Sequence, residues 1–194
     1  MSISAETAVA PRHLPGDLAM WLFILAELSV FALLILAFAA TQVLKPQLFA
    51  DSRQLLDTST GLAMTLSLLS AGLLAALAQQ RVRQAQTHQA AGLLLLALLA
   101  ACGYLLLKLG EYRHLLSLGL GLEHNTFFTL YWILTGFHFL HVLLGMLILA
   151  WLAAGCRRGR YGPGHCSGFE SGVLYWHMVD LVWVVLFPLV YLLG

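Results

Sequence analysis

"LYWHMVDLVWVVLFPLVYLLG" (residues 174–194) closes the chain and decides its fold class. The stretch is apolar throughout and close to the ~20 residues that a helix needs to cross a bilayer. It nevertheless carries a histidine and an aspartate three positions apart, His177 and Asp180. Ionisable groups are costly inside a membrane, so they usually pair with one another or serve a function. The stretch therefore predicts a membrane helix whose two ionisable side chains pair with each other or serve a function.

The composition of the whole chain agrees with a membrane protein. Of its 194 residues, 60% are hydrophobic and only 10% are charged, whereas a soluble domain averages about 45–50% and about 25%. A net charge of +1 gives no indication of a nucleic-acid partner. The cysteines Cys102, Cys156 and Cys166 form no paired motif, so we expect them to be free.

Apolar segments long enough to span occur at residues 16–40, 58–79, 89–112, 126–151 and 171–193. Backbone groups in lipid must bond within their own segment, so these segments should be helices. The predicted fold is an all-α integral membrane protein, a bundle of five transmembrane helices. Residues 1–15 should be a cytoplasmic segment and residues 16–194 one membrane domain. The first apolar run is too long for a cleavable signal and should remain as a helix.

The basic residues predict the orientation, because cytoplasmic loops carry an excess of Lys and Arg. An interior N-terminus places on the inside Arg12, Arg81, Arg83, Arg157, Arg158 and Arg160. The outside connections then carry only Lys45 and Arg53, while Lys108 and Arg113 lie at the outer end of the third helix, where such side chains snorkel. This indicates an N-in, C-out topology with Gly194 outside. Gly162-Pro163-Gly164 is read as a turn, since no nucleotide-binding context surrounds it.

Small residues recur at every fourth position of the second helix, at Ala63, Ser67, Ala71 and Ala75. Such a stripe lets another helix approach closely. We expect it to be a packing face.

The costly polar positions inside the helices are Glu27, Lys108, Glu111, His138, His141, His177 and Asp180. Most occur in pairs separated by three residues, which share one helical face. His177 is expected to hydrogen-bond Asp180, because the pair is cheaper in lipid than either group alone.

Three interpretations of these groups remain open from the residues alone. A metal or haem site fits the residue types, but the metal-binding pattern His-Glu-x-x-His does not occur. A proton or ion path through a transporter would call for inverted repeats or broken helices, and the sequence has neither. The third interpretation is structural, with hydrogen bonds between helices and contacts with lipid headgroups.

Five stretches along the chain give it a resemblance to a known family, that of cytochrome c oxidase subunit III. "GFESGVLYWHMVDLVWVVLFPLVYLLG" (168–194) resembles its last helix and "TGFHFLHVLLG" (135–145) its Gly-Phe-His-x-x-His helix. "LGEYRH" (109–114) resembles its Glu-Tyr motif, and "LFILAELSVF" (22–31) its helix with a buried carboxylate, here Glu27. "LLDTSTGLAMTLSLLSAG" (55–72) resembles its Ser-rich helix.

The resemblance implies a non-catalytic subunit without a cofactor, metal or catalytic residue of its own. In that family a partner, subunit I, holds the haems and metal, while subunit III packs beside it, binds phospholipid in a cleft and supports proton uptake and sustained activity. It implies interhelical or lipid-associated roles for Glu27, Glu111, His138, His141, His177 and Asp180.

The common long form of this family has seven helices, and this chain is expected to have five, so the full lipid cleft is in doubt. "RHLPGDLAMWLFILAELSVFALLILAF" (12–38) looks most like the accessory protein of bacterial nitric oxide reductase. The sequence thus favours an accessory subunit of nitric oxide reductase in a bacterial inner membrane. The alternative is subunit III of an oxygen-reducing cytochrome c oxidase.

Overall fold

The computed structural model describes residues 18–162 and 166–193, and within them five helices are long and apolar enough to cross a membrane. They are α1 (Leu18–Leu44), α3 (Thr58–Arg83), α4 (Thr87–Ser117), α5 (Thr126–Arg157) and α6 (Ser167–Phe187), the last continued by a π-helical turn, η1 (Pro188–Leu192). The predicted all-α bundle of five spanning helices is therefore confirmed. The predicted segment 1–15, Arg12, the turn at Pro163-Gly164 and Gly194 lie outside the described residues.

Most helices extend beyond their predicted ends. α1 continues to Leu44 instead of residue 40, α4 to Ser117 instead of 112, and α5 to Arg157 instead of 151. Apolarity ends where the hydrocarbon ends, but helical backbone bonds continue into the polar interface. The predicted first connection also contains a short helix, α2 (Pro46–Arg53), which begins with a proline at a position where its missing N–H costs nothing.

Local sequence sets the helix ends. The Asp57 carboxylate caps α3 by accepting hydrogen bonds from the backbone N–H groups of Ser59 and Thr60. Gly119 and Gly159, just after α4 and α5, have φ of 73° and 67°, a left-handed conformation that favours glycine. Ala85 adopts the same conformation after α3, with a φ of 61°.

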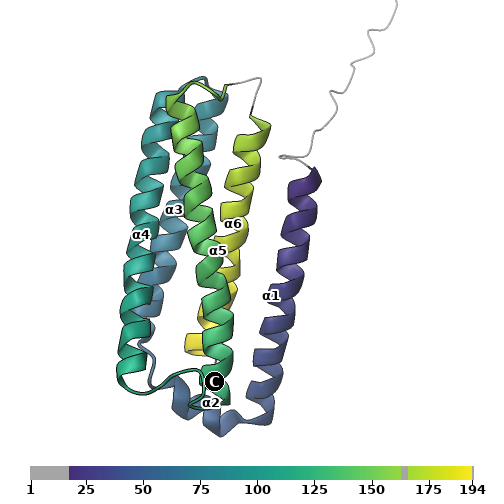
Figure 1. Ribbon diagram of the computed structural model, residues 1–194, viewed down its shortest axis with the longest axis vertical. Coiled ribbons are helices and arrows are strands. Elements are labelled where there is room, and N and C mark those ends of the chain that lie inside the picture. Colours follow the sequence, from purple (N-terminus) through teal and green to yellow (C-terminus); the bar gives the residue numbers. More distant parts are fainter. Residues whose placement is uncertain (1–17, 163–165, 194) are drawn as a thin grey trace, which may run out of the picture.

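In Figure 1 the helices α3, α4, α5 and α6 run side by side as a bundle, while α1 stands at one edge. The most extensive contact between helices is that of α3 with α4. Among the spanning helices, α1 packs mainly on α5 and α6. The predicted small-residue stripe is only partly right, because Ala71 and Ala75 are buried but Ala63 is exposed. Ser67 of the stripe donates a hydrogen bond to the Ala100 carbonyl oxygen on α4, while the close approach to α6 occurs at Gly72, which the stripe did not include.

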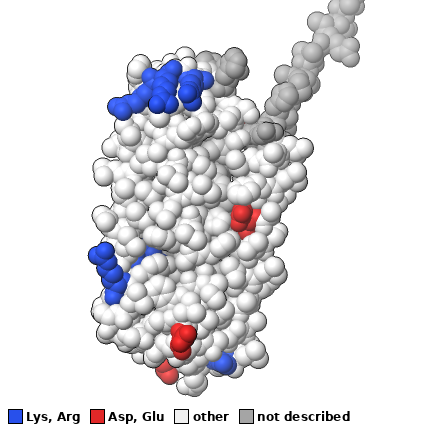
Figure 2. All heavy atoms as spheres, viewed as in Figure 1, with Lys and Arg blue, Asp and Glu red and all other residues white. Residues whose placement is uncertain are grey.

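Basic residues gather at one end of the bundle (Figure 2). Arg81 and Arg83 lie in the last turn of α3 and Arg157 in the last turn of α5, so the chain direction brings them to the same end. Between the two ends most of the visible surface is uncharged, as expected of a lipid-facing band, apart from an acidic group near mid-height and basic side chains at the lower left.

Candidate functional site

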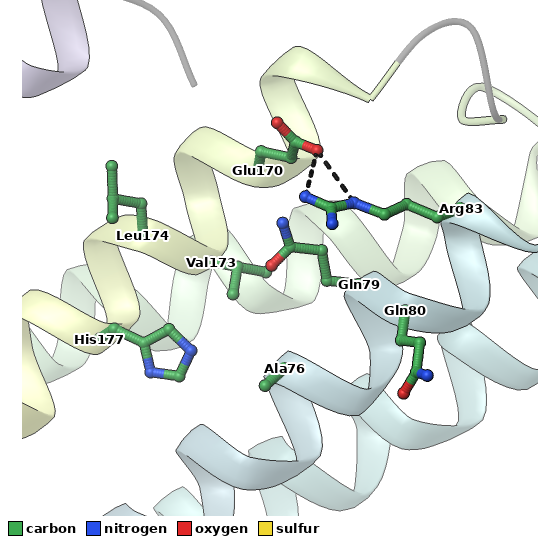
Figure 3. Close-up of a pocket in the computed structure, with 8 residues that line it drawn as sticks. All are labelled: Ala76, Gln79, Gln80, Arg83, Glu170, Val173, Leu174 and His177. Carbon is green, nitrogen blue, oxygen red and sulfur yellow. Dashed lines mark hydrogen bonds and ion pairs between the residues drawn. The ribbon is translucent and has the colours of Figure 1, made fainter. Parts of the chain in front are cut away.

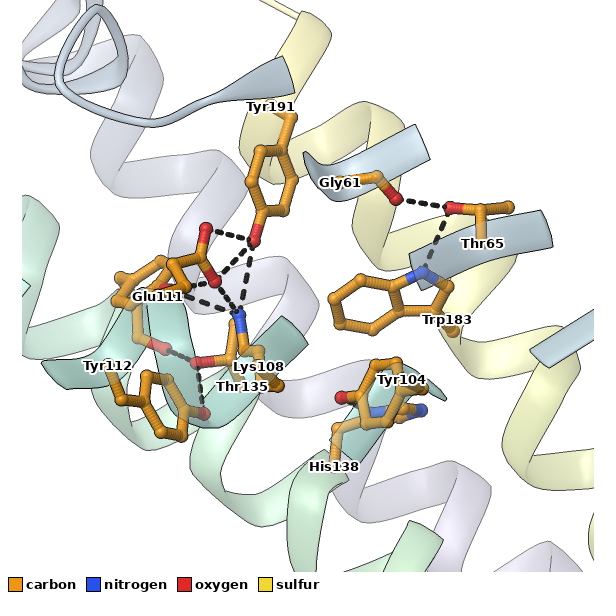
Figure 4. Close-up of polar contacts among 11 residues, drawn as sticks. Gly61, Thr65, Tyr104, Lys108, Glu111, Tyr112, Thr135, His138, Trp183 and Tyr191 are labelled. Carbon is orange, nitrogen blue, oxygen red and sulfur yellow. Dashed lines mark hydrogen bonds and ion pairs between the residues drawn. The ribbon is translucent and has the colours of Figure 1, made fainter. Parts of the chain in front are cut away.

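A buried ion pair joins α4 to α5 and η1 (Figure 4). The Lys108 Nζ donates hydrogen bonds to Glu111 Oε2 at 2.6 Å, to the Tyr131 hydroxyl at 3.0 Å and to the Tyr191 hydroxyl at 3.1 Å. The two tyrosines in turn donate to the Glu111 carboxylate, each at 2.8 Å. Every proton of the ammonium has an acceptor, so this cluster is closed upon itself.

The prediction that Lys108 snorkels to the interface is wrong. Its side chain is 0% exposed and points into the bundle. The partners Tyr131 and Tyr191 lie on other elements, and the hydrogen bonds that they accept offset part of the cost of keeping the ammonium away from water. Arg113 is not part of this cluster.

A neutral histidine lies deeper in the bundle. The Nε2 of His138 is 3.1 Å from the carbonyl oxygen of Val179 on α6, and its Nδ1 is 3.1 Å from the Tyr104 hydroxyl on α4. A carbonyl can only accept, so Nε2 carries the proton and Nδ1 accepts from Tyr104. His138 is fully buried and ties α5 to both neighbours.

Glu27 and His141 join α1 to α5. The His141 Nε2 lies 2.9 Å from Glu27 Oε2, and its Nδ1 lies 2.8 Å from the Phe137 carbonyl oxygen. The carbonyl can only accept, so Nδ1 carries a proton and Nε2 faces the Glu27 carboxyl group. The contact gives each polar group a partner among apolar side chains, which lowers the cost of placing them there.

His177 and Asp180 form the hydrogen bond that the sequence predicted, with Nδ1 and Oδ2 3.3 Å apart. Asp180 is buried and lies directly against α3, because a Cβ added at Gly72 would be 2.2 Å from its Oδ2. The absence of a side chain at Gly72 is thus what admits the carboxylate between α3 and α6.

The side chain of His177 is 41% exposed and borders two neighbouring pockets. The first, of about 350 Å³, lies between α3 and α6 (Figure 3) and is also lined by Gln79, Gln80 and the ion pair of Arg83 with Glu170, whose atoms are 2.9 Å apart. The second, of about 200 Å³, lies between α1 and α6 and is otherwise apolar. A polar pocket thus adjoins an apolar one at His177.

Of the six predicted site residues, the structure gives each a polar partner, but it does not bring all six together. Glu27 pairs with His141 and His177 with Asp180, while Glu111 and His138 belong to separate clusters. Among the described residues, no group of three His, Cys, Asp or Glu side chains is placed to hold a metal ion. Their predicted structural and lipid-associated roles remain predictions.

Sequence reasoning missed the tyrosines Tyr104, Tyr131 and Tyr191 as partners. Tyrosine in a membrane helix is expected at the interface, where its ring anchors the protein. The available signal was the i, i+3 spacing of Lys108 and Glu111, which places both charges on one face of the helix. An ion pair buried in this way needs further hydrogen-bond partners from neighbouring helices.

Comparison with known proteins gives a match along almost the whole chain. A family model described as cytochrome c oxidase subunit III matches residues 12–194. Cytochrome c oxidase subunit 3 of Synechocystis is 46% identical over 97 residues, which are 48% of this chain and 40% of that protein. A heme-copper oxidase subunit I+III of Aeropyrum pernix is 31% identical over 90% of this chain and 22% of that protein.

A quinol oxidase subunit 3 of Bacillus subtilis is 26% identical over 91% of this chain and 86% of its own length. The matched regions thus span less than half of the Synechocystis and Aeropyrum proteins but most of the Bacillus protein.

Proposed function

Because the chain belongs to the cytochrome c oxidase subunit III family, we propose that it is a non-catalytic accessory subunit of an oxygen-reducing haem–copper oxidase in a bacterial inner membrane. The match over residues 12–194 carries the proposal. The relatives described above are named as subunits of a cytochrome c oxidase, a heme-copper oxidase and a quinol oxidase. They favour the oxidase alternative of the sequence analysis over the nitric oxide reductase assignment, which stays an untested prediction.

The proposed partner is a subunit I-type protein. The name of the Aeropyrum relative joins subunits I and III in one chain, and the part matched by this chain is only 22% of it. Such a fusion supports a stable one-to-one contact between the two subunits. The buried polar groups described above are satisfied within this chain, so the proposed contribution is helix packing that sustains the activity of the partner.

We test this role by deleting the gene and isolating the partner. The haem spectrum of the partner should be intact, while its activity should decline faster during turnover than in the complete complex. The purified chain alone should reduce neither oxygen nor nitric oxide. Loss of the partner's haems on deletion, or turnover by the isolated chain, would contradict the accessory role.

Capture of the complex through an affinity tag on this chain identifies the partner. A catalytic subunit with haem and copper supports the oxidase proposal, and one with haem and non-haem iron supports the nitric oxide reductase alternative. The two outcomes are distinguished by elemental analysis of the same preparation.

A bound phospholipid is a finer part of the proposal. The pockets that meet at His177 combine a polar end, lined by the Arg83–Glu170 ion pair and two amides, with an apolar extension, which suits a polar headgroup and an acyl chain. Lipid extracted from the purified complex should fall on Arg83→Gln substitution and stay unchanged on Arg113→Gln. Equal lipid content in both variants would argue against this site.

A further inference from the structure

We propose that the aromatic rings around Lys108, together with Glu111, form a binding site for a primary ammonium ion, which the chain fills with its own lysine side chain. The proposal rests on the buried cluster in Figure 4 and is independent of the oxidase assignment. The ligand class is a primary alkylammonium ion.

The hydrogen-bonding geometry fits a primary ammonium specifically. The Lys108 Nζ has three acceptors, namely Glu111 Oε2 and the hydroxyls of Tyr131 and Tyr191, at 2.6 to 3.1 Å. A primary ammonium has three N–H donors, so donors and acceptors match in number. A quaternary ammonium has none and would leave all three acceptors unmet.

The walls of the site add a second source of cation affinity. The Nζ lies 5.0 Å from the ring centroid of Tyr112 and 5.3 Å from that of Trp183, whereas it meets Tyr131 and Tyr191 at their hydroxyl groups. A cation within about 6 Å of an aromatic face is attracted by the ring, and more strongly where water is excluded. The side chain of Glu111 is only 7% exposed, so its charge also acts at short range with little screening.

The residues that surround the ammonium group come from four elements, whereas the ammonium group itself belongs to Lys108 on α4. Tyr112 and Glu111 lie on α4, Tyr131 on α5, Trp183 on α6 and Tyr191 on η1. The tyrosine hydroxyls also donate to Glu111, which orients the acceptors without the lysine. Removing the ammonium leaves a buried carboxylate without its counter-charge, so the empty site should favour a replacement cation.

The size of the ligand follows from the substitution Lys108→Ala. It removes the side chain beyond Cβ, which is a propyl chain that ends in the ammonium group. Propylammonium therefore restores both the volume and the charge. Propanol restores the volume without the charge, and tetramethylammonium restores the charge without the N–H donors.

The experiment measures the thermal unfolding of the purified full-length chain in detergent at constant ionic strength. Lys108→Ala should lower Tm by on the order of 10 °C, the scale for an orphaned buried charge in a chain of this size. Propylammonium should recover at least half of that loss in a saturable manner. Propanol and tetramethylammonium should not, and the recovery should disappear in the Lys108→Ala, Glu111→Gln double variant. Recovery by tetramethylammonium, or none by propylammonium, overturns the proposal.

A second measurement covers the case in which Lys108→Ala yields no folded protein. Trp183→Leu removes one wall of the site but leaves the lysine in place. It should lower Tm more in the original chain than in the Lys108→Met, Glu111→Gln chain, where the cation and its buried counter-charge are both absent and the volume is kept. Equal losses in the two backgrounds mean that the ring does not bind the ammonium, which also overturns the proposal.

Discussion

At the scale of single residues, Asp180 depends on two neighbours from different elements. His177, one turn before it on α6, lies 3.3 Å away, and Gly72 on α3 leaves the space that the carboxylate occupies. This pairing explains why the apolar helix α6 keeps two polar side chains, His177 and Asp180. Each offsets the cost of the other, and together they lie at the α3–α6 contact.

We expect the two side chains to be energetically coupled. Polar contacts in membranes average about 0.6 kcal/mol with a maximum near ~1.7 kcal/mol, so Asp180→Asn should destabilise the chain only modestly. Alanine is the suitable truncation, because it removes the polar atoms and places no new atoms against Gly72. The loss for Asp180→Ala with His177→Ala should be smaller than the sum of the single losses, as measured by thermal unfolding. Strict additivity would mean that the side chains do not interact.

Asp57 predicts a pH dependence of stability outside the membrane. Hydrogen bonds from the Ser59 and Thr60 side chains lower the pKa of Asp57 from 3.8 to about 2. Because the pKa is lower in the folded chain, the stabilisation is complete above pH 3.8 and is lost as the pH falls toward 2. The difference in Tm between the chain and its Asp57→Asn variant should therefore be constant at neutral pH and change between those values. Asn also caps helices, so it serves as the uncharged control. A difference that does not vary over this range would contradict the assignment.

At the scale of elements, glycine positions decide how closely α5 and α6 pack. A Cβ at Gly145 on α5 would lie 2.8 Å from the ring of Trp176 on α6. That ring is fully buried. The α5–α6 contact thus depends on a missing side chain, as the α3–α6 contact does at Gly72.

Gly145→Ala should destabilise the chain by about 1–3 kcal/mol, the cost of overpacking a well-packed core. Gly136→Ala is the matched control in the same helix, because nothing lies within 4 Å of a Cβ added there. It should be neutral or slightly stabilising, since alanine favours helix more than glycine does. The comparison is made by thermal unfolding in detergent, and equal effects of the two substitutions would refute this account of the interface.

At the scale of the whole molecule, the bundle has one basic end, and this predicts its orientation. Arg81, Arg83 and Arg157 lie in the last turns of α3 and α5, and basic residues favour the cytoplasmic side. The expected topology is N-in and C-out.

Reporter fusions after Arg83 and after Arg158 should give a cytoplasmic signal, and a fusion at Gly194 should give an exterior one. Substituting the arginines at the basic end by glutamine in one variant tests the cause, because the orientation should then become mixed. A cytoplasmic signal from the fusion at Gly194 in the original chain would contradict the topology.

The sequence by itself determined the class of the fold and the number of spanning helices. A chain in lipid must satisfy its backbone within each segment, so length and apolarity suffice to locate the helices. It also determined the family, through motifs within single helices, and the local pair of His177 with Asp180. These features share one property, which is that each depends on residues close together in the chain.

Only the tertiary structure decided which distant groups meet. His141 pairs with Glu27 across 114 positions, and Lys108 reaches Tyr191 across 83. Whether such groups meet depends on the rotation and the axial shift of one helix against another. Those are set by the shapes of side chains at contacts such as Gly72 with Asp180 and Gly145 with Trp176. Hydropathy does not encode these shapes, because every face of a membrane helix is apolar, whether it meets lipid or another helix.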